Sequence, residues 1–110
     1  MEHAVKIIND SNFDTEVIES PGLFILKLCH GRTCDPYSFD KIEEELAEEY
    51  HGDVRFGLLD TEENHYTAQR LLASEKDVYI FFKENQEIAR FGAGLSKQEL
   101  KDLIHEHFGY

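Results

Sequence analysis

Residues 23–36 have the sequence LFILKLCHGRTCDP, and this stretch decides how the rest of the chain is interpreted. Residues 23–28 are almost continuously apolar, which is typical of a strand buried on both faces of a sheet. A long amphipathic segment begins near Pro36, so we expect a strand, a loop and a helix in that order. Both cysteines of the chain, Cys29 and Cys34, lie between these elements. Because the unpaired N–H groups at a helix N-terminus favour a thiolate, the cysteines are the first candidates for chemistry.

The remaining sequence predicts an alternation of strands and helices. Strands are expected at residues 5–8, 23–28, 54–59, 78–82 and 87–91, and the last two form a hairpin through the polar link 83–86. Helices are expected at 13–18, with capping side chains from Asn9, Asp10 and Ser11, at 36–50, at 66–72, and after Ser96, which forms a capping box with Glu99. The order β-α-β-α-β-α-β-β-α predicts an α/β fold, a central mixed sheet with helices on both faces.

Composition and charge narrow the possible partners. A chain of 110 residues with 41% apolar and 31% charged residues is expected to form a single domain over residues 1–110. Its 23 acidic and 11 basic side chains give a formal net charge of −12, which would repel nucleic acid and anionic membranes. A net charge of this size keeps a small protein soluble, and it is also compatible with binding of a basic partner. With neither a secretory signal nor an apolar stretch of membrane-spanning length, a cytoplasmic protein is expected.

Several short motifs, together with the order of elements, resemble the thioredoxin family over nearly the whole chain. They are Asn12-Phe13-Asp14 before the first helix, residues 45–50 closing the second helix, Asp60 after the third strand, Phe82-Lys83 in the hairpin, and residues 92–100 leading into the last helix. The resemblance implies a thioredoxin fold and thiol–disulfide chemistry at the loop before the second helix. It implies no cofactor.

The thiol motif of the chain departs from the family pattern. Thioredoxins carry Cys-x-x-Cys at the start of the second helix, where one thiolate attacks a substrate disulfide and the other resolves the mixed intermediate. Without gaps, residues 33–36 (Thr-Cys-Asp-Pro) fall on this motif, and a shift by one residue places 34–37 (Cys-Asp-Pro-Tyr) there. Neither alignment gives a dithiol at the usual spacing.

Two further positions differ from the family. Lys76-Asp77-Val78 stands where the family has a cis-proline before the fourth strand, and a cis bond before Asp77 would cost about 3 kcal/mol. Lys27 stands where the family has a buried acid in the second strand, and we expect its ammonium group to reach solvent. Along the second helix, Glu43, Glu44 and Glu45 are expected to form a solvated face.

The cysteines can still form a pair. Gly31 lies between them and allows the loop to fold back, so that the two sulfur atoms come within bonding range. So small a ring would stabilise the fold by only about 2 kcal/mol, which is more typical of a reversible bond than of a structural one. Arg32 favours the thiolate of Cys34, whereas Asp35 opposes it.

Three interpretations of the cysteines follow from the sequence. The leading hypothesis is thiol–disulfide exchange or redox sensing, with Cys34 as the nucleophile and Cys29 as the resolving thiol. The second is a non-catalytic module that binds a protein or peptide in the corresponding groove, and the third gives the cysteines no chemical role, Cys29 being a buried apolar residue. Under either of the first two, the expected binding residues are Arg32, Thr33, Asp35, Pro36, Tyr37, Asp77 and Val78. His30 and the cysteines lack the paired spacing of a zinc site, so no metal is expected.

Overall fold

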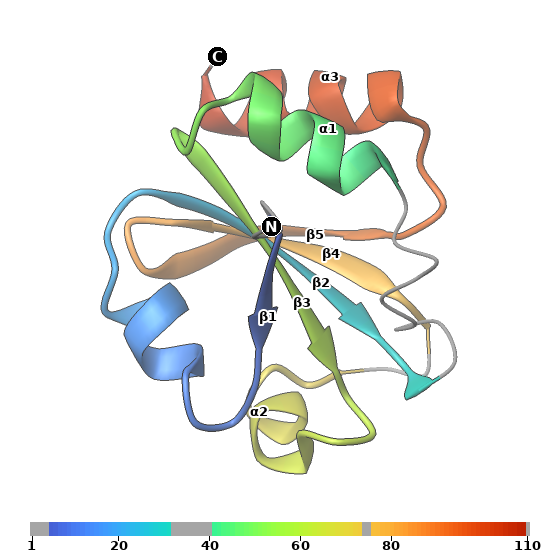
Figure 1. The fold of residues 1–110 in the computed structure, drawn as a ribbon. Helices are drawn as coiled ribbons and strands as arrows, with labels where there is room; N and C mark the ends of the chain where they lie inside the picture. Colours follow the sequence, from blue (N-terminus) through green and yellow to red (C-terminus); the bar gives the residue numbers. More distant parts are fainter. Residues whose placement is uncertain (1–4, 32–40, 74–75, 110) are drawn as a thin grey trace.

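The computed structural model describes residues 5–31, 41–73 and 76–109. Within these ranges the elements follow in the order β1 Val5–Ile8, η1 Asp14–Ile18, β2 Leu23–Cys29, α1 Lys41–Glu49, β3 Val54–Asp60, α2 His65–Arg70, β4 Val78–Lys83, β5 Gln86–Gly92 and α3 Lys97–Phe108 (Figure 1). The expected strands are therefore present, and residues 36–40 of the expected second helix lie outside the described residues.

The strands form one mixed sheet in the order β1-β3-β2-β4-β5. Both β1 and β2 run parallel to β3, whereas β4 runs antiparallel to β2 and to β5. In this register Cys29 lies opposite Asp60 on β3, and Lys27 lies opposite Leu58 on β3 and Tyr79 on β4. The carboxyl ends of the central strands β2 and β3 therefore meet at the same edge of the sheet.

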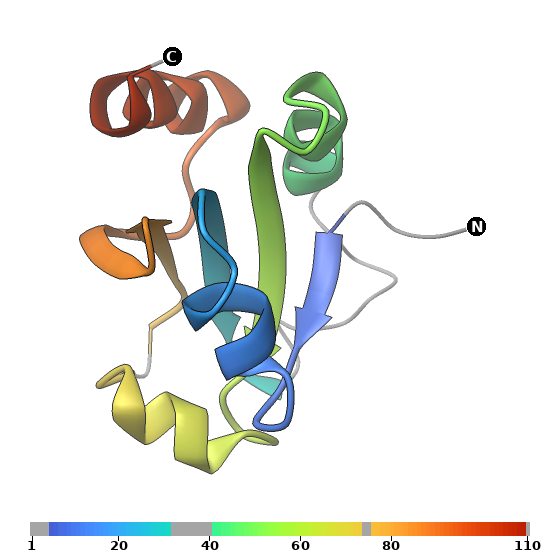
Figure 2. The same cartoon turned by 90° about the vertical axis from the view of Figure 1, so that its left-hand side faces the viewer.

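Helical segments cover both faces of the sheet, as Figures 1 and 2 show. Helices α1 and α3 lie on one face, and η1 and α2 lie on the other. The molecule has a hydrophobic core on each face of the sheet. Residues that alternate along a buried strand pack into one core or the other, because successive side chains of a strand point to opposite faces. On β2, Ile25 and Cys29 pack with Leu46 of α1 and Ile104 of α3. The expected mixed α/β architecture is thus confirmed for the described residues.

The first helical segment differs from the expected α-helix. Residues Asp14–Ile18 form one turn of π-helix, in which the N–H of Glu19 donates to the carbonyl oxygen of Asp14 at 2.7 Å. Phe13 and Val17 are nearly completely buried, so the apolar pattern correctly predicted which side of the segment faces the core. The pattern did not predict the wider turn, which is a short-range feature of the backbone.

The capping role expected for Asp10 was assigned to the wrong helix. Its Oδ1 accepts hydrogen bonds from the backbone N–H of Thr67 at 2.9 Å and from the Thr67 hydroxyl at 2.6 Å. Thr67 lies in the first turn of α2, 57 residues further along the chain, so Asp10 caps α2 across space. Asn9 instead orders its own loop, because its Oδ1 accepts the N–H groups of Ser11 and Asn12.

Two local sequence signals near the C-terminus have the expected effect. The hairpin link is a two-residue turn at Glu84 and Asn85, whose φ values of 50° and 72° fit a type I′ turn that matches the twist of the strands. The capping box is complete, because Glu99 N donates to Ser96 Oγ at 3.1 Å and Ser96 N donates to Glu99 Oε1 at 3.0 Å. Helix α3 therefore begins where the sequence predicted.

Candidate functional site

Cys29 ends β2 at the edge where β2 and β3 finish. Its side chain has no exposed surface, and its Sγ lies 3.4 Å from the carbonyl oxygen of Leu59. The carbonyl oxygen of Cys29 accepts both the N–H and the hydroxyl of Thr61, each at 2.9 Å. The backbone of Cys29 is thus tied to the turn after β3, and the sulfur atom points into the core beneath α1 and α3.

Most of the expected site lies outside the described residues. This applies to Arg32, Thr33, Cys34, Asp35, Pro36 and Tyr37. The geometry of the site is therefore built from its described side, which consists of Cys29, His30, Gly31, Asp77 and Val78.

The structure brings the expected residues Asp77 and Val78 next to the start of the loop. Val78 opens β4 opposite Leu28, and Asp77 Oδ1 lies 3.0 Å from Nδ1 of His30. The carbonyl oxygen of Asp77 accepts the N–H of Ala93 at 2.9 Å. All peptide bonds between described residues are trans, including the one before Asp77. The segment before β4 and the residue after Cys29 therefore face each other across a direct side-chain contact.

Asp60 at the end of β3 and the next two residues, Thr61 and Glu62, complete this edge, and the sequence did not identify them as site residues. Asp60 Oδ1 accepts the N–H of Gly31 at 3.1 Å and the N–H of Glu62 at 2.9 Å. Gly31 has a φ of 48°, and a Cβ there would clash with the carboxylate of Glu62. A usable signal was present, since Asp60, Thr61 and Glu62 are a polar run directly after a buried strand. In an open sheet such a run lies beside the carboxyl end of the neighbouring parallel strand.

The expectation for Lys27 is wrong. Its Nζ lies 3.2 Å from Oε1 of Glu43 on α1, and the two side chains are only 15% and 5% exposed. The Tyr79 hydroxyl donates to the same carboxylate oxygen, and the Lys27 ammonium lies 5.6 Å from the centre of the Tyr79 ring. The ammonium of Lys27 contacts a buried acid from another element, and only a small part of the side chain is exposed. Lys27 and Cys29 are two residues apart on β2 and share one face of the sheet.

The expectation of a solvated acidic face on α1 holds for Glu45 but is wrong for Glu43. Glu43 is 4% exposed and Glu44 is half-buried, whereas Glu45 is exposed. Glu43 lies three and four residues before Leu46 and Ala47, and these positions share one side of a helix. That side packs on the sheet, so Glu43 is carried into the core, where Lys27 and Tyr79 bind one of its oxygens.

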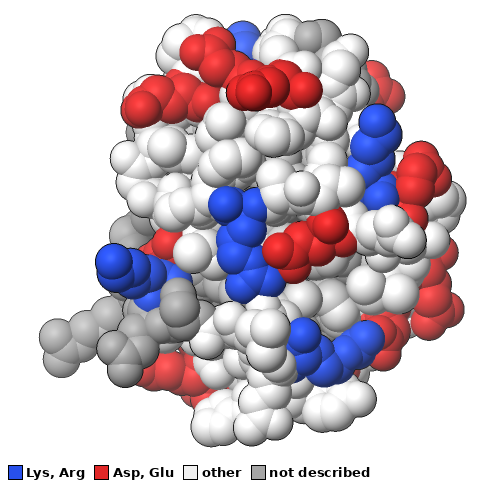
Figure 3. Space-filling model, turned by 180° about the vertical axis from the view of Figure 1, so that it is seen from behind, with Lys and Arg blue, Asp and Glu red and all other residues white. Residues whose placement is uncertain are grey.

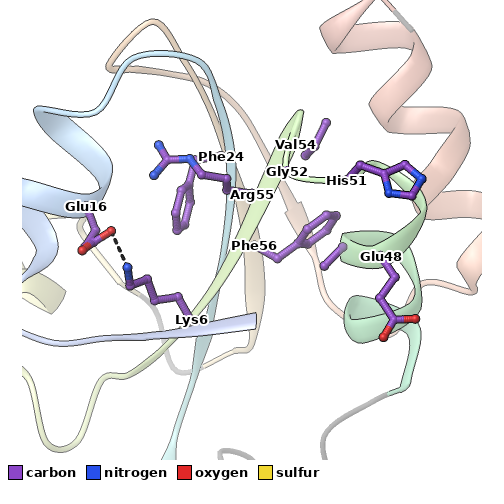
Figure 4. A pocket seen from close by; sticks show the side chains of 10 residues that line it. Lys6, Glu16, Phe24, Glu48, His51, Gly52, Val54, Arg55 and Phe56 are labelled. Carbon is purple, nitrogen blue, oxygen red and sulfur yellow. Dashed lines mark ion pairs between the residues drawn. The ribbon is translucent and has the colours of Figure 1, made fainter. Parts of the chain in front are cut away.

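A hollow lies at the opposite end of β3, and the described residues that line it include no cysteine (Figure 4). It has a volume of about 530 Å³ and is lined by Lys6, Glu16, Phe24, Ala47, Glu48, His51, Gly52, Val54, Arg55 and Phe56. The pairing of β1 with β3 begins at Phe56, so the hollow opens beside Val54 and Arg55. Lys6 and Glu16 form an ion pair of 2.9 Å at its rim. This hollow is separate from the Cys29 edge of the sheet.

The surface charge of the molecule is unevenly distributed. Figure 3 shows the face that carries β5, where acidic side chains gather at the upper end over α3, while the middle and lower parts carry Lys and Arg side chains among acidic and uncharged ones. The acidic excess of the chain is therefore not spread evenly over this face. In the part of the chain that the structure describes, no helix is both long and apolar enough to cross a lipid bilayer.

Comparison with known proteins places the chain among its relatives. It is 30% identical to the thioredoxin of Buchnera aphidicola subsp. Schizaphis graminum over 101 residues, which are 91% of this chain and 93% of the relative. The chain belongs to the thioredoxin family. The thioredoxin of Buchnera aphidicola subsp. Acyrthosiphon pisum is 29% identical over the same share of both chains. No protein-family model matches the chain. Membership of the thioredoxin family agrees with the mixed sheet and directs attention to the edge at Cys29.

Proposed function

We propose that this member of the thioredoxin family takes part in thiol–disulfide exchange or redox sensing through the pair Cys29 and Cys34. The observation that carries the proposal is the position of Cys29, which ends the central strand β2 in a chain whose relatives are thioredoxins. With four residues between the cysteines, the chemistry would use a wider spacing than Cys-x-x-Cys.

The reaction has two steps in which electrons and atoms balance. The thiolate of Cys34 attacks one sulfur of a partner disulfide, forms a mixed disulfide and releases the other sulfur as a thiolate, which takes a proton from water. The thiolate of Cys29 then attacks Sγ of Cys34 and releases the second partner thiolate. The partner gains two electrons, the protein is left with a Cys29–Cys34 disulfide, and an external thiol reductant restores the two thiols.

The burial of Cys29 supports this order of attack. A sulfur with no exposed surface cannot meet a disulfide on another protein, but it can attack a sulfur on its own loop. Cys29 therefore suits the resolving step, and the first attack is assigned to Cys34. The hydrogen bond from the Thr61 hydroxyl to the carbonyl oxygen of Cys29 holds the backbone of this proposed resolving residue at the end of β2.

Reduction of insulin disulfides by the protein in the presence of dithiothreitol tests the proposal. We expect wild type to speed the reaction and Cys34→Ser to abolish it. Incubated with insulin in the absence of dithiothreitol, Cys29→Ser should stop at a mixed disulfide that mass spectrometry detects. Mild oxidation of wild type should give an intramolecular bridge with a mass loss of two hydrogens. Absence of both the bridge and any mixed disulfide at Cys34 would reject the proposal and leave a non-catalytic binding module as the alternative.

A further inference from the structure

A groove lies beside the candidate thiol site, on the side of α2. It has a volume of about 440 Å³ and is lined by His30, Thr61, Glu62, His65, Ala68, Gln69 and Ala73. His30 directly follows Cys29, so one wall of the groove is the start of the loop that carries the second cysteine. The groove lies at the carboxyl ends of the parallel strands β2 and β3, where open sheets usually bind their ligands.

The groove carries negative charge. Its lining contains the carboxylate of Glu62. Two further carboxylates lie beside it: Asp60, which ends β3 and accepts the N–H groups of Gly31 and Glu62, and Asp77, which contacts His30. Among the described residues that line the groove there is no lysine or arginine. The formal net charge of −12 adds a long-range field of the same sign. A segment carrying positive charge is therefore attracted to this groove, whereas an acidic segment is repelled.

A leucine is held in solvent at the end of α2, next to the groove. Leu72 is 83% exposed, the highest value among the exposed large apolar side chains of the described residues, and its φ is 52°. Arg90 fixes this conformation, because it donates to the carbonyl oxygens of Leu71 at 2.7 Å and Leu72 at 3.4 Å. Glu87 in turn holds the Arg90 guanidinium through two hydrogen bonds. A left-handed backbone is unfavourable for leucine, so β5 stabilises a conformation that presents an apolar side chain to solvent.

We propose that this groove docks an extended segment of the protein partner that bears lysine or arginine and an apolar side chain, which packs on Leu72. The inference rests on the proposed function, because the docked segment would bring a disulfide of the partner to the thiol loop. Glu62 supplies the charge that selects the cationic segment, and Leu72 supplies apolar contact beside it. Both act by positioning the partner and neither takes part in the exchange of sulfur bonds.

Fluorescence anisotropy with two labelled peptides that lack cysteine measures docking without any thiol chemistry. One probe carries two lysines around a leucine, and the matched probe carries two glutamates at the same positions. For the full-length reduced protein we expect the lysine probe to bind at least about tenfold more tightly at low salt. The difference should shrink at 1 M salt, where the Debye length falls to about 3 Å. Equal binding of the two probes would overturn the proposal.

Matched variants distinguish binding of the lysine probe at the groove from a general attraction by the net charge of the protein. Glu62→Gln and Leu72→Asn should each weaken binding of the lysine probe about threefold or more, and asparagine tolerates the left-handed backbone of Leu72. The controls are Glu106→Gln, at an exposed position of α3, and Ile88→Thr, at an exposed position of β5. Both controls should bind like wild type. If Glu106→Gln weakens binding as much as Glu62→Gln, attraction is non-specific and the groove is not the docking site.

Failure of the proposed function is measured separately from failure of docking. The small neutral substrate bis(2-hydroxyethyl) disulfide reports exchange at the cysteines without using the groove. If this disulfide does not react but the lysine probe still binds in a manner that depends on Glu62 and Leu72, the docking groove stands without the redox chemistry. If the disulfide reacts but the two peptides bind equally, the redox chemistry stands and the docking groove is rejected.

Discussion

Lys27 on β2 and Glu43 on α1 form an ion pair of 3.2 Å inside the molecule, and the Tyr79 hydroxyl of β4 donates to the same carboxylate oxygen. The trio joins three elements beneath the sheet edge that carries Cys29. The other carboxylate oxygen, Oε2 of Glu43, is buried and accepts no hydrogen bond from any residue that the structure describes. Both charged groups are largely buried away from water. Each therefore destabilises the fold unless the other is present to neutralise it.

Removing one member of this pair should be more harmful than removing both. Lys27→Met is expected to lower the free energy of unfolding by about 3 kcal/mol, because it leaves the Glu43 carboxylate buried without its cation. In the double variant Lys27→Met/Glu43→Met the loss should be clearly smaller than the sum of the single losses. Urea denaturation of the four proteins completes a double-mutant cycle.

A surface ion bridge between α3 and α1 provides the control for that cycle. Lys97 bridges Glu45 and Glu49 at 3.2 and 2.9 Å, and all three side chains are at least one third exposed. Lys97→Met should therefore cost less than about 1 kcal/mol. Strictly additive losses for Lys27 and Glu43 would contradict the coupling that the structure indicates.

Gly57 on β3 is required by close packing rather than by backbone conformation. A Cβ at this position would lie 2.7 Å from Cζ of Phe24 and 2.8 Å from Cγ1 of Ile8, and both neighbours are buried. Gly57→Ala should lower stability by about 1–3 kcal/mol, as overpacking of a core does. Gly92→Ala on β5 is the matched control, since nothing lies within 4 Å of a Cβ there. Equal melting temperatures for the two variants would refute this account of Gly57.

The cap that Asp10 forms on α2 should make stability depend on pH. Hydrogen bonds from the Thr67 hydroxyl and backbone hold the pKa of Asp10 below its ordinary value of 3.8. A lowered pKa in the folded state stabilises the fold above the unfolded pKa, and this contribution is lost as the pH falls through the folded pKa. The melting temperature of Asp10→Asn should therefore lie below that of wild type at pH 6 and approach it below about pH 3.

Asp53→Asn removes the same charge from an exposed turn and serves as the control for Asp10. Its difference from wild type should be small and should change little over the same pH range. If Asp10→Asn keeps a constant difference down to the lowest pH, the charge of Asp10 does not stabilise the α2 cap.

The contacts of Arg90 should control local opening at the end of α2. The N–H groups of Leu72 and Ala73 donate to Gln69 and Ala68 at 3.1 and 2.9 Å, and Arg90 holds the adjacent carbonyl groups. In Arg90→Lys the forked contact is lost, so we expect amide hydrogen exchange at Leu72 and Ala73 to accelerate about tenfold. Arg70→Lys, which alters a different contact of α2 with Asp14, should leave these two amides unchanged. Unchanged exchange in Arg90→Lys would mean that other contacts hold Leu72.

The parts of the fold that the sequence predicted are those governed by local periodicity and local hydrogen bonds. The strand at residues 5–8 has the predicted bounds, and β2 extends one residue beyond the predicted strand. Apolar runs locate buried strands because only apolar side chains are stable on the buried faces of a sheet. The Ser96–Glu99 capping box was predictable for a similar reason, since its partners are three residues apart.

The candidate site was predicted only in part. The placement of Asp77 and Val78 beside the loop followed from the resemblance to the thioredoxin family, and the structure brings both residues to the start of that loop. The groove along α2 was not predicted, because its walls come from segments that are distant in sequence. The helical spacing from Glu43 to Leu46 and Ala47 is compatible with a buried acid, but the partners that stabilise it, Lys27 and Tyr79, come from other elements.

The amino-acid sequence by itself determined the strands, the start of α3, the position of both cysteines next to a buried strand, and the acidic charge. Tertiary structure alone decided which partner each charged side chain contacts: Lys27 contacts Glu43, Asp10 contacts Thr67, and Arg90 contacts the end of α2. The periodicity of a segment indicates which of its sides is buried. Which side chains contact one another depends on how close the elements lie after they pack. Because a buried charge is stable only beside an opposite charge or a hydrogen-bond donor, these pairings are properties of the packed molecule and of no single segment.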